Sequence, residues 1–116
     1  MSPPRLSVPL VLEASVREPD GMGGFTLAWQ SVSRFWAEMR SGAGGEKFAE
    51  VGARSVVTWR ILIRSVRAGD PRRPRPEQRL VMGEGVHQRC FRIEAVAEAD
   101  NLGRYLVCFA KEETAA

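Results

Sequence analysis

Residues 57–64 read VTWRILIR and carry the clearest periodic pattern in the chain. Every second side chain is apolar, namely Val57, Trp59, Ile61 and Ile63. Thr58, Arg60 and Arg64 stand between them, so apolar and polar groups lie on opposite faces of an extended backbone. A period of two with β-branched and aromatic residues is typical of a strand that buries one face. The pattern predicts a strand in the middle of a sheet.

Two further strands are predicted on the N-terminal side of this segment. The first runs from Leu6 to Val16, with apolar residues at Leu6, Val8, Leu10 and Leu12. Pro9 lacks a backbone N–H, which favours an edge strand. Turn-forming residues fill 18–24, and a long strand then runs from Phe25 to about Met39. Phe25, Leu27 and Trp29 alternate before the apolar phase moves to Val32 and Trp36, which predicts a bulge near Ser31.

The C-terminal half predicts three more strands. A short one surrounds residues 80–82, and a longer one spans 86–96 with Phe91, Ile93 and Ala95 on one face. After a reversal at 100–103, alternating Tyr105, Val107 and Phe109 mark the last strand. Residues 111–116 are predicted to form a polar tail.

Two segments interrupt the strands. Residues 41–54 begin with SGAGG and are predicted to be a mobile loop, with a short helix at 46–51 that ends at Gly52. Residues 68–78 hold Pro71, Pro74 and Pro76 among arginines, which predicts an exposed, semi-stiff Pro/Arg loop.

Six strands with short turns and almost no helix indicate a mainly β protein. We expect a small antiparallel β-barrel of about six strands, with the long loop and one short helix between strands 2 and 3. The 116 residues provide one core, so residues 1–116 are predicted to be a single domain.

Composition argues against several functional classes. No apolar run approaches the roughly 20 residues of a membrane-spanning helix, and residues 1–5 lack the apolar core of a signal peptide. The chain has one histidine, His87, and no nucleophile or metal motif around it. We therefore expect no enzyme activity, no cofactor, no metal and no membrane partner. Cys90 and Cys108 are interpreted as buried free thiols, although a cross-strand contact between them stays open.

The charge pattern leaves a binding function open. Seventeen basic residues against 14 acidic ones give a formal charge of +3, and all the basic residues except Lys47 and Lys111 are arginine. Arginine suits phosphate and protein interfaces equally well, and a GC-rich genome also raises its frequency. One hypothesis is therefore a small basic β-barrel that binds single-stranded nucleic acid. Trp36 and Trp59 are predicted to lie in the core, while Trp29 is left undecided between the core and a partner surface.

The order of these features resembles one family, the head-tail joining or head-closure (stopper) proteins of tailed phages and gene transfer agents. The resemblance spans nearly the whole chain, and its Arg-rich, cysteine-poor style is similar to the alphaproteobacterial gene transfer agent branch. The residues on which the resemblance rests are LE at 12–13, DGMGGF at 20–25, Trp29, Val32, FWA at 35–37, GE at 45–46, TWRI at 58–61, RL at 79–80, FRIEAV at 91–96, GRYL at 103–106 and EE at 112–113. The Pro-Arg insert at 70–76 is less typical of the family.

The resemblance implies a structural virion protein. It would form a homo-oligomeric ring, expected to be a hexamer, in the neck of the particle after assembly in the bacterial cytoplasm. The ring would lie below the portal and its adaptor ring and above the tail terminator or tail tube, around the double-stranded DNA of the channel.

The family's channel gate matches the loop at 41–54. The residues that the resemblance assigns to it are Gly42, Gly44, Gly45, Glu46, Lys47, Phe48, Val51 and Arg54. From the residues themselves, Arg72, Arg73, Arg75 and Arg79 form the densest basic cluster, which would contact DNA phosphate or an acidic neighbouring ring. A solvated loop is the alternative for that cluster.

Overall fold

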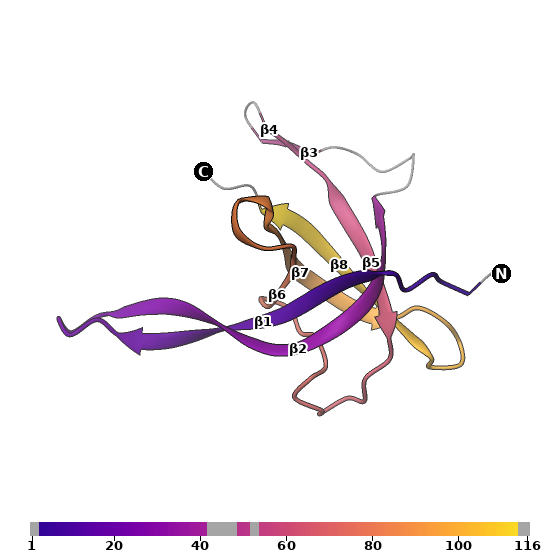
Figure 1. The fold of residues 1–116 in the computed structure, drawn as a ribbon, viewed down its shortest axis with the longest axis horizontal. Coiled ribbons are helices and arrows are strands. Elements are labelled where there is room, and N and C mark those ends of the chain that lie inside the picture. The colour runs from indigo at the N-terminus through magenta and orange to yellow at the C-terminus, as the bar shows by residue number, and fades with distance from the viewer. Residues whose placement is uncertain (1–2, 42–48, 52–53, 114–116) are drawn as a thin grey trace.

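In the computed structural model, which describes residues 3–41, 49–51 and 54–113, six antiparallel strands form one closed, ring-like sheet (Figure 1). The strand order around the ring is β1-β2-β5-β8-β7-β6, and β6 pairs with β1 to close it. The strands of the ring are β1 (Val8–Pro19), β2 (Phe25–Ser41), β5 (Thr58–Arg64), β6 (Arg79–Met82), β7 (Arg89–Glu98) and β8 (Tyr105–Glu113). The predicted mainly β, six-stranded antiparallel barrel is confirmed.

The inward faces of these strands supply the hydrophobic core. Among the described residues the fully buried side chains include Leu10, Leu12, Ile61, Ile63, Leu80, Phe91, Ile93, Leu106, Cys108 and Ala110. Trp59 packs on this cluster edge-to-face with Phe91, with 5.8 Å between the ring centroids. The predicted strand at 57–64 thus buries the expected face, and β5 has a neighbour on each side, β2 and β8.

Two bulges set which residues face inward. Leu12 pairs with Ser33 and Glu13 with Ser31, so Val32 is the extra residue that the change of phase predicted near Ser31. A second register shift between Ile93 and Ala95 leaves Glu94 unpaired in β7. The prediction that Ala95 shares a face with Phe91 and Ile93 is therefore wrong, since the bulge moves Ala95 to the exposed side.

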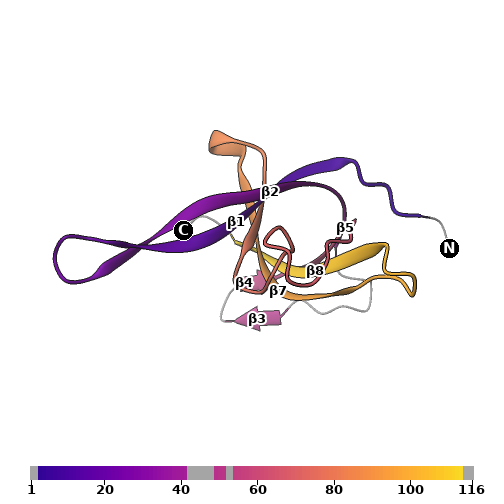
Figure 2. The same cartoon turned by 90° about the horizontal axis from the view of Figure 1, so that it is seen from below.

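The hairpin of β1 and β2 extends well beyond the barrel. β6 pairs with only residues 11–13 of β1, and β5 pairs with only residues 37–41 of β2. The ribbon of residues 14–30, here called the arm, projects alone from the ring in Figures 1 and 2. The predicted edge position of β1 is wrong, because β1 has strands on both sides. Pro9 is tolerated since the pairing with β6 begins only at Val11.

A separate antiparallel pair consists of β3 (Ala49–Val51) and β4 (Arg54–Val56). This pair stands apart from the ring sheet (Figure 1). The helix predicted at 46–51 is wrong over its described residues, 49–51. A six-residue helix followed by glycine forms too few internal hydrogen bonds to offset its nucleation, whereas strand pairing satisfies the backbone directly.

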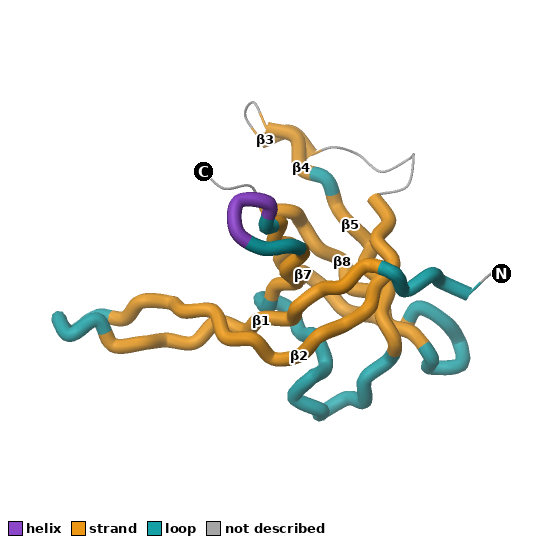
Figure 3. The backbone as a smooth tube through the Cα atoms, viewed as in Figure 1, coloured by secondary structure: helices purple, strands orange, loops and turns teal. Residues whose placement is uncertain are grey.

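The remaining connections correct three further details. The strand predicted to start at Val86 begins at Arg89, because η1 (Gly85–His87), a single 3₁₀ turn, precedes it (Figure 3). Residues 111–113 belong to β8 and not to a polar tail. The Pro/Arg loop is irregular as predicted but not wholly exposed, since Pro74 is fully buried. In the described ranges, no helix has the length and apolar character needed to cross a membrane.

Candidate interaction surfaces

The arm presents an apolar face that is largely exposed at its outer end, at Phe25 and Leu27. Cross-strand pairing places Phe25 opposite Pro19, Leu27 opposite Arg17 and Trp29 opposite Ser15 on one face of the ribbon. Phe25 is 63% exposed, Leu27 66% and Trp29 37%. Three large apolar groups in a row on an exposed face mark an interaction surface, since scattered single residues are the usual pattern.

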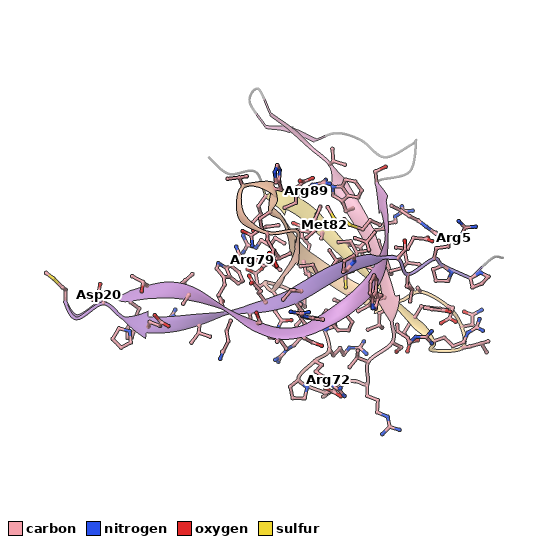
Figure 4. All side chains as sticks on the ribbon, in the orientation of Figure 1. Arg5, Asp20, Arg72, Arg79, Met82 and Arg89 are labelled. Carbon is pink, nitrogen blue, oxygen red and sulfur yellow. The ribbon has the colours of Figure 1, made fainter. Side chains whose placement is uncertain are left out.

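The turn at the tip of the arm is held by one carboxylate. Asp20 Oδ1 accepts hydrogen bonds from the backbone N–H of Met22 at 2.8 Å and of Gly24 at 3.0 Å. Gly21 and Gly23 both have positive φ, which this tight reversal requires. Asp20 is labelled at the end of the ribbon in Figure 4. The tip is therefore a defined turn that fixes the register of the two strands behind it.

At its root the arm is joined to the barrel by three side chains. Arg79 Nε donates to Glu13 Oε1 at 2.7 Å, and the Arg79 guanidinium lies 4.1 Å from the centroid of the Trp29 ring. Both charged side chains are mostly buried. The undecided Trp29 is thus half covered by a cation on one side, while the rest of its surface lines a depression of about 170 Å³ with Leu27 and Arg92.

A second apolar surface lies on the outside of the barrel, where β1 passes between β2 and β6. We call this cavity of about 390 Å³ the outer groove; it is lined by Pro9, Leu10, Val11, Arg34, Phe35, Trp36, Val81, Gly83 and Glu84. Trp36 is 61% exposed, so the prediction that it is a core residue is wrong. Alternation explains this: the neighbouring Phe35 and Ala37 face inward, which directs Trp36 outward.

The four arginines of the predicted basic cluster are divided between the Pro/Arg loop, which carries Arg72, Arg73 and Arg75, and strand β6, which carries Arg79. Arg72 forms two hydrogen bonds with the Asp70 carboxylate, at 3.2 and 3.0 Å, and Arg73 donates to the backbone oxygen of Val66 at 2.7 Å. Arg79 lies on β6 at the root of the arm, well away from Arg72 in Figure 4. The hydrogen bond from the Arg72 side chain lowers the pKa of Asp70 to about 2.

Arg75 differs from the other three members of that cluster. Its side chain is exposed and forms no ion pair within the described ranges, while its backbone N–H donates to Gln78 Oε1 at 2.9 Å. A contact with DNA or a neighbouring ring therefore stays a prediction for all four arginines. Of the four arginines, Arg75 is the one whose side chain could make such a contact without giving up a partner in the described part of the chain.

The predicted gate lies largely outside the described residues. Gly42, Gly44, Gly45, Glu46, Lys47 and Phe48 are not among them. Val51 and Arg54 are paired residues at the adjacent ends of β3 and β4. Since Ser41 pairs with Trp59, β2 ends and β5 begins at the same end of the barrel, so the segment between them leaves and returns at that end.

An ion pair ties the start of β7 to the end of β8. Arg89 donates from Nε and from one terminal nitrogen to the two oxygens of Glu112, each at 2.8 Å. The same guanidinium lies 5.2 Å from the Phe91 ring centroid and 5.6 Å from that of Trp59. The hydrogen bonds from Arg89 hold the pKa of Glu112 below its ordinary value of 4.5.

This ion pair predicts a loss of stability in acid. A carboxyl whose pKa is lowered by folding adds stability above its unfolded pKa, and the gain is lost as the pH falls through its folded pKa. We expect the free energy of unfolding to fall between about pH 5 and about pH 3, and to fall less in Glu112→Gln over the same interval. Urea denaturation at several pH values measures both slopes. Equal slopes in the two proteins would contradict the assignment.

The described residues carry no arrangement typical of catalysis or metal binding. No group of three His, Cys, Asp or Glu side chains in the described part of the chain is placed to hold a metal ion. Cys108 is buried as predicted, and burial raises the pKa of its thiol to about 12. Cys90 is only half buried, and the two cysteines are not cross-strand partners, since Cys90 pairs with Glu113 and Cys108 with Val96.

The closed sheet, the projecting arm and the outer groove define a small, mainly β protein with two exposed apolar surfaces. Residues 1–113 match the model of the phage head completion protein family. The chain belongs to this family of structural virion proteins. No curated protein matches the sequence.

Among solved structures the chain is similar to a chain from the virion of a native gene transfer agent particle. The two are 47% identical, with a TM-score of 0.73 over 98% of this chain and 100% of the other. The likeness therefore covers the arm and the barrel together. The resemblance found in the sequence is confirmed.

Proposed function

We propose that this protein closes the DNA-filled head of a tailed phage or gene transfer agent and provides the surface on which the tail docks. The observation that carries the proposal is the match of residues 1–113 to head completion proteins, together with 47% identity to a gene transfer agent virion chain over its full length. A component of this kind works by covering and joining surfaces, which suits a rigid barrel with two exposed apolar surfaces and no catalytic constellation among the described residues.

In this proposal several copies form a ring, six by the symmetry of such tails, in the neck of the particle. The adaptor ring and portal lie above it, the tail terminator or tail tube lies below, and double-stranded DNA occupies the channel. Packaged DNA carries about one charge per 1.7 Å of its axis, so closing the channel requires a steric barrier more than recognition of bases. The segment between Ser41 and Thr58 leaves one end of the barrel, which suits a role as that barrier.

The alternative of single-stranded nucleic acid binding receives less support. Such binding uses free cations beside exposed aromatic rings on which bases stack. Here the arginine nearest to Trp29 is Arg79, which already pairs with Glu13 and covers one side of the ring. Arg72 is likewise held by Asp70. The two groups would have to exchange these partners for phosphate before binding.

Deleting the gene from the producing strain tests the proposed function. We expect electron micrographs to show DNA-filled or leaking heads without attached tails, and free tails beside them. Expression of the intact chain from a plasmid is expected to restore tailed particles, which controls for effects on neighbouring genes. Intact tailed particles in the deletion strain would overturn the proposal.

A further inference from the structure

The arm lacks what a two-stranded ribbon needs in order to be stable alone. Isolated hairpins are marginal in water unless a third strand or another surface covers one face. Among the described strands, β1 has no second neighbour beyond Glu13, and residues 25–36 of β2 pair only with β1. The face with Phe25 and Leu27 is open to solvent. In the described part of the chain Phe25 and Leu27 remain 63% and 66% exposed, which suits a cover supplied by a second molecule.

The same chain carries a surface of matching character. The outer groove offers Pro9, Val11 and Trp36 as apolar contacts, on the part of the hairpin that belongs to the barrel, with the buried Val81 of β6 beneath them. Its exposed Trp36 is a large aromatic group of the kind that anchors protein interfaces. The apolar face of the arm on one copy and the outer groove on another copy are therefore complementary in character.

Charges at the two surfaces are also complementary. Arg17 is the cross-strand partner of Leu27, on the apolar face of the arm, and its guanidinium lies 5.9 Å from the Phe25 ring centroid. Glu84 lines the outer groove at the turn after β6, and Arg34 lines it on the β2 side. Within the described part of the chain neither Arg17 nor Glu84 forms an ion pair, whereas Glu13, Asp70 and Glu112 each do. Pairing of Arg17 on the apolar face of the arm with Glu84 of the outer groove would set the register of a contact between two copies.

We propose that the apolar face of the arm of one copy seats in the outer groove of the next copy, with Leu27 against Trp36 and Arg17 beside Glu84. The inference rests on the proposed ring and names the surfaces that build it. Because the two surfaces differ, the contact is head to tail, and repeating it either closes a ring or extends a chain. The arm spans roughly 20 Å from residue 14 to residue 20, enough to reach across a neighbouring barrel of similar size.

Disulfide trapping tests this contact in the purified full chain. In a Cys90→Ser background, Leu27→Cys with Trp36→Cys is expected to give, on oxidation, a ladder of dimers, trimers and larger species on non-reducing gels. The native Cys108 is buried and stays unreactive. The matched control replaces Leu27→Cys by Thr26→Cys, which lies on the opposite face of the same arm. A missing ladder, or an equal ladder from the control, would overturn the proposal.

Mixing the two single-cysteine proteins tests the head-to-tail direction. Leu27→Cys alone and Trp36→Cys alone each retain one complementary surface. Their mixture is expected to stop at a dimer with one copy of each, because no further cysteine is available. Dimers of Leu27→Cys alone that form as readily as mixed dimers would indicate an arm-to-arm contact and would overturn the proposal.

Charge reversal tests the register. Arg17→Glu and Glu84→Arg are each expected to lower the yield of the trapped species about tenfold, and the double reversal is expected to restore it. Two neutral single reversals, or a double reversal that stays defective, would contradict the pairing. The result is independent of the deletion experiment. A ladder together with normal tailed particles in the deletion strain would contradict only the proposed role in head closure. Tailless particles in the deletion strain without a ladder would contradict only the proposed interface.

Discussion

Phe91→Ala is expected to lower the free energy of unfolding by about 3–5 kcal/mol, the largest effect of any single substitution considered. Phe91 is fully buried, and its ring packs against Trp59 and the aliphatic side chains of the core. Alanine removes those contacts and leaves a cavity that a closed sheet cannot fill by moving one strand alone. Since small domains are stable by only about 5–15 kcal/mol, the variant would retain little of its stability.

Urea denaturation followed by tryptophan fluorescence measures this loss. Phe25→Ala is the matched control, because it removes the same ring from the exposed arm. We expect the control to change the free energy of unfolding by less than about 0.5 kcal/mol, as is usual for surface positions. Equal losses from the two substitutions would show that the arm is part of the folding core, contrary to the exposure of its apolar face.

Arg79→Ala is expected to give the second largest loss, about 2–3 kcal/mol, although Arg79 is a surface cation by type. The substitution leaves the mostly buried Glu13 carboxylate without its ion-pair partner and exposes one side of the Trp29 ring. A double-mutant cycle with Glu13→Gln isolates the pair. We expect the double variant to lose less than the sum of the single variants, because the second change then removes no partner.

The free energy of unfolding of Arg79→Ala, measured together with its affinity for DNA, distinguishes two roles for Arg79. A structural role predicts a lower unfolding free energy in the absence of any polyanion. A role as a DNA contact predicts an unchanged free energy of unfolding and a weaker, less salt-dependent affinity for DNA. Arg75→Ala is the control, because its exposed side chain has no ion pair in the described ranges. If Arg79→Ala and Arg75→Ala were equally stable, the anchoring of the arm would have to be assigned elsewhere.

Periodicity was sufficient to predict the barrel. The alternation at 57–64 and 6–12 identified the inward faces, and the change of phase after Trp29 located the bulge at Val32 to within one residue. The prediction for Pro9 failed because sequence alone does not show that a further strand pairs with the other side of β1. The prediction for Trp36 failed because the phase of β2 after the bulge at Val32 directs Phe35 and Ala37 inward and Trp36 outward.

The exposed arm was not predicted, although the sequence contains a signal for it. Phe25, Leu27 and Trp29 alternate as a buried face would, yet the segment opposite them, residues 13–18, is mostly polar. A core face requires apolar residues on both paired strands, whereas a partner surface requires them on one. The outer groove left no such signal, because its lining comes from three strands and the 83–84 turn, brought together only by closure of the sheet.

The single extra residue at Val32 determines which face of the arm carries Phe25, Leu27 and Trp29. On the C-terminal side of Val32, residues 33, 35 and 37 of β2 share the side of Leu10 and Leu12. On its N-terminal side, residues 25, 27 and 29 share the side of Glu13 and Arg17. If Val32 were instead paired as an ordinary strand residue opposite Glu13, every residue of β2 on its N-terminal side would shift by one, and Ala28 would lie opposite Arg17 where Leu27 now lies. Insertions and deletions in one strand of this hairpin are therefore constrained by parity: an odd change that no bulge absorbs moves the apolar face to the other side of the ribbon, and an even change alters only its length.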